Sequence, residues 1–522
     1  MGTEGLTRFG RARPLRRERQ GAPENILEVG PILHFRGSRE DHWRLSALFV
    51  FVGGREPPGL SVDAVAQPVR PHLLARHHDR HFWRYDFAVP RRHAGVRTGY
   101  GFPDGTRWYF TVPGRGDDPR IAYTACNGSE DEDVRHLPAG RNARWAHLLG
   151  RHRGTPFHLA LHGGDQLYAD AVWARSPALA AWNARSWRER LDLPFTPEMA
   201  AETEDHFIDH YVRLWRQPET AAFLASAPSI MMWDDHDIFD GWGSHPDERR
   251  ASPVFQGVYT VARHCFSLFQ MGMDPMMPVE SCWGAATGNF CQGFRLGRIG
   301  LLALDLRSER LPRRVLSERT WTDLPGWLDR FSGVEHLILM SSVPLVHVNL
   351  NAVERLVNAW PGQARFEDDL RDQWRSYAHE TEWLRLLRLL GDFSVRRRAR
   401  VTVISGEVHL GFAAIVHGPW HDIWQLTSSG IAHPPPNRMY VRILDRLARR
   451  REVVRDGLTL EMLPYGETGT RFLRSRNWLE LAFDGTGALV ADWHAEGETA
   501  PLRHWVPSAR ERPFHSRRGE GS

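Results

Sequence analysis

The chain has 522 residues, of which 42% are apolar and 25% charged, so it has enough material for a large buried core and for more than one domain. All 67 basic residues are arginines, which excludes chemistry that needs a lysine, such as a P-loop or a Schiff base. The formal net charge is only +4 and the arginine clusters are local, so we expect no specific recognition of nucleic acid.

Cysteine usage and hydropathy indicate the cellular compartment in which we expect the protein. The four cysteines include no CxxC pair and are too few for a disulfide framework, which favours a reducing environment. The first twenty residues lack the apolar stretch of a signal peptide, and no run of about 18 apolar residues occurs. We therefore expect a cytoplasmic protein without a membrane span.

In chain order, residues 1–24 are predicted to be a polar tail. Short runs with alternating or continuous apolar residues follow, separated by proline and glycine, which is typical of β-strands. These runs predict an N-terminal β-sandwich domain over residues 25–113, followed by a linker over 113–119.

From residue 120 the pattern changes to strands that alternate with helix-length amphipathic segments, which predicts an α/β domain over residues 120–500. The expected core strands are 121–125, 157–161, 230–233, 299–304, 336–340 and 401–404. The expected helices are 141–152, 199–225, 253–269, 321–331 and 370–390. Two last strands are expected at 479–483 and 488–494. Residues 431–457 interrupt this pattern and are predicted to form a lid, and residues 501–522 are predicted to be a second polar tail.

Three predicted strands end in clusters of side chains that can bind metals, and sites in α/β sheets form at the carboxyl ends of strands. The clusters are HGGDQLYAD over 162–170, WDDHDIFDGWG over 233–243 and SGEVHLG over 405–411. Each cluster alone has an ordinary structural explanation, as a helix cap, a solvated acidic loop or a buried histidine. Together they favour a metal site, because the aspartates packed around one histidine at 234–240 would repel one another without cations.

The residue types indicate which metals and which chemistry. Oxygen ligands mixed with imidazole suit Fe, Mn, Zn or Ca. Two metals about 3.5–4 Å apart need a bridging carboxylate, for which Asp165 is the candidate. Such a pair supplies hydroxide near neutral pH and binds the oxygens of a phosphoryl group, so the predicted chemistry is phosphoester hydrolysis.

These motifs occur in the same order as the motifs of a known protein superfamily. Gly164-Asp165-x-x-Tyr168, Asp234-Asp235-His236-Asp237 and Gly406-Glu407-x-His409 resemble the GDxx[DY], GNH[DE] and GHxH pattern of the metallophosphoesterase (calcineurin-like) superfamily, and within it the PhoD-like alkaline phosphatase group. The resemblance covers about residues 121–430. It implies an N-terminal β-sandwich domain followed by a four-layer α/β/β/α metallophosphoesterase domain.

Carried over residue by residue, the resemblance implies as metal ligands Cys126, Asp165, Tyr168, Asp235, Glu407 and His409. Tyr168 would bind a ferric ion as phenolate, because a free tyrosine has a pKa of about 10 and ionises best beside a trivalent ion. The implied cofactors are two metal ions, Fe³⁺ and a divalent ion, which is Ca²⁺, Mn²⁺ or Zn²⁺. Cys126 alone is also explained as a small buried residue.

Asp165 and His236 are the implied catalytic residues, and His236 would contact the substrate phosphate and protonate the leaving group. Arg307 is a candidate for binding a phosphate oxygen, although a buried Asp–Arg pair explains it equally well. Possible additional site residues are Gln166, Asp170 and Asp240, of which Asp240 is also explained as the cap of a turn.

The chain departs from the superfamily pattern in several places. It lacks the first DxH motif, it has Asp234-Asp235 in place of Gly-Asn, and it has Glu407 where the group usually has aspartate. Ser341-Ser342 stands at the strand end where related enzymes have a histidine ligand.

The leading prediction is a metal-dependent phosphatase or phosphodiesterase that hydrolyses a small-molecule or polymeric phosphoester by metal-activated hydroxide. The motifs do not separate monoesters from diesters, and a broad cleft expected beside Trp233, Trp242 and the predicted lid would accept diesters. The alternative is a non-catalytic, metal-stabilised scaffold or binding protein of the same fold. The sequence has no G-x-S-x-G motif, so a serine hydrolase of that type is excluded.

Overall fold

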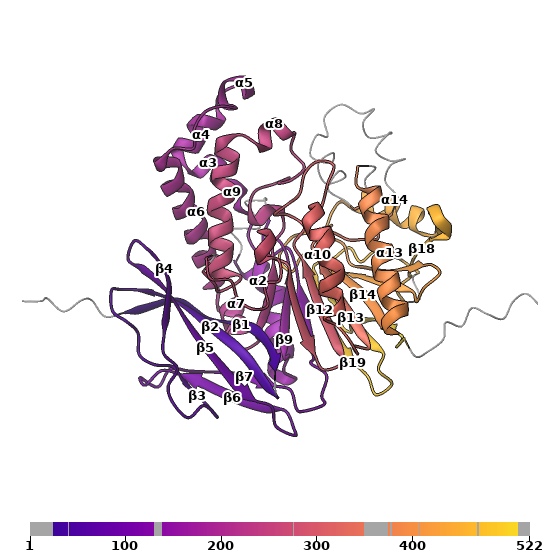
Figure 1. The fold of residues 1–522 in the computed structure, drawn as a ribbon, viewed down its shortest axis with the longest axis horizontal. Helices are drawn as coiled ribbons and strands as arrows, with labels where there is room; N and C mark the ends of the chain where they lie inside the picture. Colours follow the sequence, from indigo (N-terminus) through magenta and orange to yellow (C-terminus); the bar gives the residue numbers. More distant parts are fainter. Residues whose placement is uncertain are drawn as a thin grey trace, which may run out of the picture.

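The computed structural model describes residues 25–39, 41–129, 138–274, 276–348, 374–375, 378–406, 408–466 and 469–509 of the chain. This part of the protein contains two large β-sheets with helices beside them (Figure 1). The mixed α/β class predicted from the sequence is therefore confirmed. Among the described helices, none is long and apolar enough to cross a membrane.

The first sheet has ten strands in the order β21-β20-β19-β8-β9-β10-β1-β2-β5-β4. They are β1 (Ile26–Arg39), β2 (His42–Val52), β4 (His72–His77), β5 (Arg80–Pro90), β8 (Ile121–Thr124), β9 (Leu159–Gly163), β10 (Ser229–Met232), β19 (Asn477–Phe483), β20 (Leu489–Ala495) and β21 (Leu502–Val506). Strands β8, β9 and β10 are parallel, with Thr124 opposite His162 and Met232 opposite Gly163. Their carboxyl ends therefore lie side by side.

The second sheet has eight strands in the order β11-β12-β13-β14-β16-β15-β18-β17. They are β11 (Gln292–Leu296), β12 (Ile299–Leu304), β13 (His336–Ser341), β14 (Arg400–Ser405), β15 (Phe412–His417), β16 (Ile423–Thr427), β17 (Glu452–Val453) and β18 (Thr459–Met462). Strands β12, β13, β14 and β16 are parallel and every residue in them is buried. Continuous burial is typical of parallel strands that are covered on both faces.

The two sheets share one hydrophobic core. Ile121 and Ile230 of the first sheet belong to the same buried cluster as Leu301 and Ile338 of the second. Leu302, the neighbour of Leu301, belongs instead to the cluster that includes the helices beside the second sheet. Successive side chains of a strand point to opposite faces of the sheet, so one face of β12 packs between the two sheets and the other packs against the helices.

The helices cover the outer parts of both sheets (Figure 1). Helices α10 (Glu318–Asp329), α13 (Glu380–Arg397) and α14 (Arg438–Ala448) contribute to the cluster on the second sheet, and α6 (Pro197–Trp215) and α9 (Pro253–Phe269) to a cluster on the first. Helices α2 (Pro138–Gly154) and α7 (Pro218–Leu224) form a smaller cluster with β8 and β9.

The predicted N-terminal β-sandwich is not separate from the rest of the structure. A small sheet of β3 (Ser61–Val62), β6 (Val96–Gly101) and β7 (Arg107–Val112) does face β2 and β5, with Phe49 and Trp108 ring centroids 5.6 Å apart. However, β1 pairs in parallel with β10, at His34 and Ser229, so β1, β2, β5 and β4 continue the first large sheet. A pairing between such distant residues leaves no signal in the local sequence pattern.

Two further predicted boundaries differ from the structure. The helix expected over 199–225 is two helices, α6 and α7, because Pro218 lacks the amide hydrogen that a continuous helix needs and instead begins α7. The tail expected over 501–522 begins with β21, which pairs with β20. The tail expected over 1–24 and residues 510–522 lie outside the described residues.

The predicted lid begins beside the strand ends. The amide of Ile431 donates a hydrogen bond of 2.9 Å to the carbonyl of Ala125, directly after β8. Further on, Val441, Leu444 and Ala448 of α14 are buried in the cluster on the second sheet. Movement of this segment as a lid stays a prediction.

A buried charged cluster joins β19 and β20 to the start of β8. Glu480 accepts hydrogen bonds from Arg120 at 2.7 Å and from His494 at 2.9 Å. Burial alone would raise the pKa of Glu480, but these two partners lower its pKa to about 2. The carboxylate is therefore charged in the folded protein over most of the pH range.

Candidate metal centre

The turns after four strands bring the predicted motifs together. Cys126 follows β8, Asp165 follows β9 and Asp234 follows β10, while His409 follows β14 in the second sheet. Cys126, Asp165 and His409 have φ angles of 50°, 53° and 53°, in the left-handed region that residues other than glycine rarely adopt. Backbone strain of this kind is found most often at functional sites.

The first group of candidate ligands combines Cys126, Asp165 and His409. One ligand atom from each of these residues lies within 4.8 Å of the other two. The Cys126 Sγ is 3.5 Å from Asp165 Oδ2, and the Tyr168 hydroxyl is 3.1 Å from His409 Nε2. Sulfur, carboxylate, phenol and imidazole together form a set suited to a transition-metal ion.

The second group consists of three aspartates, Asp165, Asp234 and Asp235, whose carboxylate oxygens also lie within 4.8 Å of one another. An all-oxygen set suits a hard cation. Asp165 belongs to both groups, which is the position that a bridging carboxylate needs.

Burial makes this cluster unfavourable unless cations are present. Asp165 is 1% exposed and Asp234 is fully buried. Burial and the nearby Asp234 and Asp235 raise the pKa of Asp165 well above its usual value, although His236 opposes the change. Among the described residues, Asp165 Oδ1 has no hydrogen-bond partner. A buried carboxylate oxygen without a partner is costly, so these residues fit bound metal ions.

Arg307 supplies part of the compensating charge. Its side chain is fully buried, its Nε donates to Asp234, and its Nη2 lies 3.4 Å from Asp235 Oδ1. The structure therefore contains buried Asp–Arg pairs, formed with Asp234 and Asp235. Contact of Arg307 with a substrate phosphate stays a prediction. Clustered buried carboxylates need such a fixed counter-charge beside them.

His236 is held by Asp170. The distance from His236 Nδ1 to Asp170 Oδ2 is 2.9 Å, and the ring stacks on Tyr168 with centroids 4.3 Å apart. Burial alone would lower the pKa of His236, but Asp170 and Asp235 raise its pKa well above the usual value. These two carboxylates therefore favour the protonated form of the imidazole.

The other predicted site residues differ in whether they lie near the candidate ligand atoms. Asp240 is exposed and lies with Asp235 and His236 in a third group of candidate ligand atoms. Gln166 is buried and its side-chain amide donates to the carbonyl of Gly164 at 3.0 Å, which stabilises the turn after β9. Glu407 lies outside the described residues.

Asp237, the last residue of the second motif, connects two of the turns. Its carboxylate accepts hydrogen bonds from the amides of Leu167 at 3.0 Å and Asp234 at 2.9 Å, and from the side chain of Gln270 at 2.8 Å. Burial raises the pKa of Asp237 to about 7, although these donors oppose the change. Asp237 therefore positions the first two motifs relative to each other.

Three residues at the site had not been predicted as site residues. Asp234 is one of the clustered carboxylates, and Ser342 donates to it at 2.8 Å from the strand end where a histidine ligand is usual. His433 stacks on His409 with centroids 3.4 Å apart. The position of His433 depends on the contact of residues 430–433 with the end of β8, which no local pattern indicates.

The broad cleft expected beside Trp233 and Trp242 is not formed by these residues. Trp233 is fully buried and its Nε1 donates to Asp305 at 2.8 Å. Trp242 is buried and stacks on Tyr259 with centroids 4.6 Å apart. Both rings pack into the core on the first sheet because aromatic and aliphatic side chains surround them there.

The chain is similar in sequence to one curated protein. The chain is 27% identical over 403 residues to an uncharacterized protein of Saccharomyces cerevisiae, and the match covers 64% of this chain and 57% of that protein. The chain therefore spans just over half the length of its yeast relative.

Two solved structures resemble the fold. The structure of PhoD matches with a TM-score of 0.57 and 12% identity, over 91% of this chain and 88% of that one. A purple acid phosphatase from yellow lupin seeds matches with a TM-score of 0.49 and 11% identity, over 91% of this chain and 74% of that one.

The family comparison covers most of the chain. Residues 103–365 and 359–459 match the family described as PhoD related phosphatase. These ranges include the strand ends and turns that carry Cys126, Asp165, Asp235 and His409. The chain belongs to the PhoD related phosphatase family.

Proposed function

We propose that the protein is a metal-dependent phosphoesterase with a binuclear site, acting on phosphomonoesters or phosphodiesters. The observation that carries this proposal is the place of Asp165, which two groups of candidate ligands share. Two cations bound there would supply the positive charge that activates water and offsets the charge of a phosphoryl group.

The two groups differ in chemistry, which suggests different metals. Cys126, Tyr168 and His409 provide sulfur, phenol and imidazole atoms around Asp165, and we propose that they hold Fe³⁺. Asp234 and Asp235 provide only oxygen atoms, which suits Ca²⁺, Mn²⁺ or Zn²⁺. Glu407 is proposed to complete the second set.

The side chains around the metals have separate roles in this proposal. His236 contacts the substrate phosphate and gives its proton to the leaving oxygen. Asp170 fixes the orientation of that imidazole and favours its protonated form. Arg307 keeps Asp234 and Asp235 charged and in place.

The finer architecture is also proposed. Helices lie beside both large sheets and the two sheets share a core, which supports a four-layer α/β/β/α order for residues 120–500. Residues 25–113 would be an attached β-rich part whose larger sheet continues into that unit.

The test uses Asp165→Asn. The substitution removes the shared charge but keeps the shape, and asparagine tolerates the positive φ at this position. Hydrolysis of p-nitrophenyl phosphate and bis-p-nitrophenyl phosphate should fall by at least about 10²–10³-fold. The matched control is Asp247→Asn on the exposed helix α8 (Asp247–Arg250), which should leave turnover unchanged.

Two outcomes would refute the proposal. Equal turnover in Asp165→Asn and wild type would eliminate the binuclear mechanism. A wild-type protein that binds metal but hydrolyses neither ester would favour the alternative, a metal-stabilised scaffold of the same fold.

A further inference from the structure

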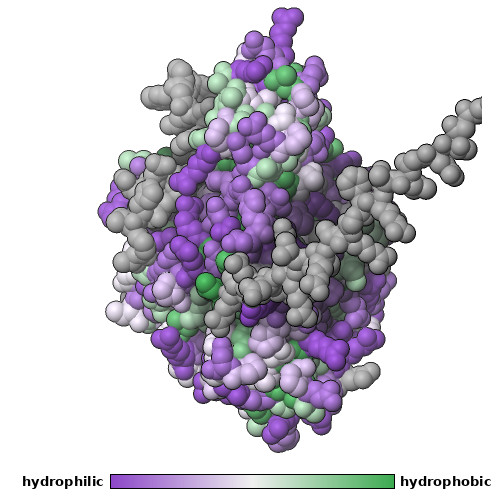
Figure 2. All heavy atoms as spheres, turned by 90° about the vertical axis from the view of Figure 1, so that its left-hand side faces the viewer, coloured by the Kyte–Doolittle hydropathy of each residue, from purple (hydrophilic) through white to green (hydrophobic). Residues whose placement is uncertain are grey.

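A second group of side chains that can bind a metal lies where the β4–β5 hairpin meets α6. His77 is the last residue of β4, His78 follows it in the loop of the hairpin, and Asp205 belongs to α6. One ligand atom from each of these residues lies within 4.8 Å of the other two. The side of the molecule that carries α5 (Trp187–Arg190), α6 and β4 is largely hydrophilic (Figure 2).

The backbone of the hairpin turns the two histidines to the same side. Neighbouring side chains of a regular strand point to opposite faces of the sheet. His78 instead has a φ angle of 52°, in the left-handed region, and its ring centroid lies 4.2 Å from that of His77. Both rings direct Nε2 toward the same oxygen, Asp205 Oδ1, at 2.7 Å each. Three possible ligand atoms from two separate elements therefore converge.

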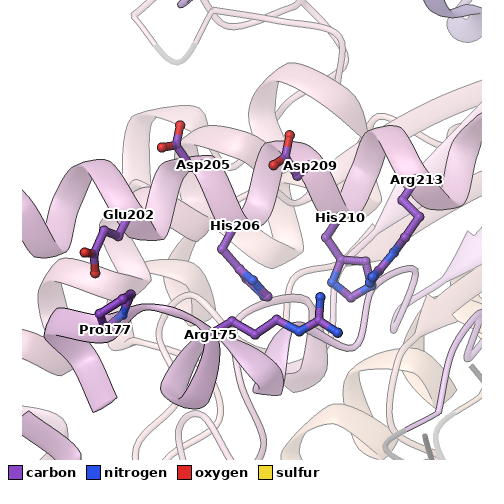
Figure 3. A pocket seen from close by; sticks show the side chains of 8 residues that line it. All are labelled: Arg175, Pro177, Glu202, Asp205, His206, Asp209, His210 and Arg213. Carbon is purple, nitrogen blue, oxygen red and sulfur yellow. The ribbon is translucent and has the colours of Figure 1, made fainter. Parts of the chain in front are cut away.

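Helix α6 presents the carboxylate to the hairpin. Figure 3 shows Asp205 and Asp209 on the side of α6 opposite to His206. Asp209, one turn after Asp205, accepts a hydrogen bond of 2.8 Å from Arg80 at the start of β5. A second pair of partners thus holds the hairpin against the helix beside the group of possible ligands.

The carboxylate of Asp205 is available in its charged form. Burial alone would raise the pKa of Asp205, but the hydrogen bonds from His78 and His77 lower its pKa below the usual value. The side chains of His78 and Asp205 are 66% and 47% exposed, so an ion can reach them from solvent and water can occupy a remaining coordination position.

A further carboxylate lies beside His77. Glu204 Oε2 is 3.7 Å from His77 Nδ1, the ring nitrogen that is not bonded to Asp205, and Glu204 Oε1 is 4.0 Å from Nε2 of His264 in α9. A histidine that binds a metal usually donates its other ring N–H to a carboxylate, which fixes the tautomer and the orientation of the ring. Glu204 stands where it can do this for His77. With Asp205 it also supplies two negative charges, which match a divalent cation.

We infer that His77, His78 and Asp205 form a zinc-binding site that ties the β4–β5 hairpin to α6. Zn²⁺ accepts imidazole nitrogen together with carboxylate oxygen, whereas Ca²⁺ and Mg²⁺ prefer oxygen ligands alone. The ion takes the place of the two Nε2 protons that lie between the rings and Asp205, and His77 then carries its proton on Nδ1, beside Glu204. None of these residues belongs to the metal centre around Asp165, so the inference goes beyond the proposed function.

The test measures binding rather than turnover. Equilibrium dialysis with radioactive Zn²⁺ would be carried out on the full-length, chelator-treated Asp165→Asn protein, in which the metal centre is already weakened. We expect saturable binding that His78→Asn, added to this protein, weakens by at least about tenfold. Asparagine tolerates the positive φ of this exposed position, so the hairpin should still form. The matched control is His72→Asn, which removes another exposed histidine from the same strand.

Two more variants test the roles of the carboxylates. Asp205→Asn should reduce zinc binding as much as His78→Asn does, because each substitution removes one ligand. Glu204→Gln should weaken binding by about tenfold without abolishing it, because Glu204 acts through His77. Excess Mg²⁺ should leave zinc bound, because two of the three ligand atoms are nitrogens.

Equal zinc affinity in the His78→Asn and His72→Asn proteins would overturn the inference, and so would displacement of the zinc by Mg²⁺ or the absence of saturable binding. The proposed function is judged separately, by the hydrolysis rate of Asp165→Asn against wild type.

Discussion

Replacement of Arg307 by methionine tests the electrostatic account of the site. The substitution keeps much of the side-chain volume but removes the charge beside two buried carboxylates, while the hydrogen bond that Asp234 accepts from Ser342 stays. Breaking a buried ion pair from one side costs about 3–5 kcal/mol, because the remaining charge is left without compensation.

This loss of unfolding free energy can be converted into a decrease in melting temperature. The entropy of unfolding is about 2.1 cal/mol/K per residue, which gives about 1.1 kcal/mol/K for a chain of this length. Arg307→Met should therefore lower the melting temperature by about 3–5 °C in chelator-treated protein. Saturating metal should reduce this loss, because bound cations take over the compensation of Asp234 and Asp235.

The measurement is thermal unfolding followed by circular dichroism, with and without chelator. Arg188→Met, on the exposed surface of α5, is the control and should shift the transition by less than about 0.5 °C. A loss below 1 °C for chelator-treated Arg307→Met would refute the reasoning, and so would a loss that metal does not change.

The remaining predictions concern positioning, stability and packing. Asp170→Asn should lower kcat by about 10- to 100-fold while the metal content measured by elemental analysis stays the same, because Asp170 orients His236 and is not among the proposed ligands. Glu480→Gln should destabilise the protein by about 3 kcal/mol at pH 7, because the Glu480 pKa is lowered from 4.5 to about 2 in the folded state. This stabilisation is complete above pH 4.5 and is lost as pH falls toward 2, so the melting temperatures of variant and wild type should converge on acidification, and a constant difference would contradict the assignment. Gly128→Ala would place a Cβ 2.3 Å from the Tyr168 ring; displacement of that ring should reduce turnover by about 10²-fold, and unchanged kinetics would show that the position of Tyr168 is unimportant.

The sequence predicts the site best where strands end. Asp165 and Asp235 follow short apolar runs, and the carboxyl ends of parallel strands meet at one edge of a sheet, so their proximity follows from the pattern. Cys126 and His409 join them for the same reason, from β8 and from the second sheet.

Long-range contacts account for what the sequence does not predict. His433 reaches the site only because residues 430–433 lie against the end of β8. The sequence explains Arg307 equally well as a substrate ligand or as the partner of a buried aspartate, and it does not indicate how deeply the side chain lies. The pairing of β1 with β10 is likewise invisible in the local pattern, and it makes the N-terminal strands part of the first large sheet.

The metal content of the purified chain tests the central proposal most directly. Protein prepared without added metal or a metal-affinity tag would be compared with Asp165→Asn by elemental analysis. We predict about two metals per wild-type chain, iron among them, and a loss of metal in the variant, because Asp165 is the ligand that both groups share. A folded wild-type chain that contains no metal and takes up none when metals are added would contradict the account.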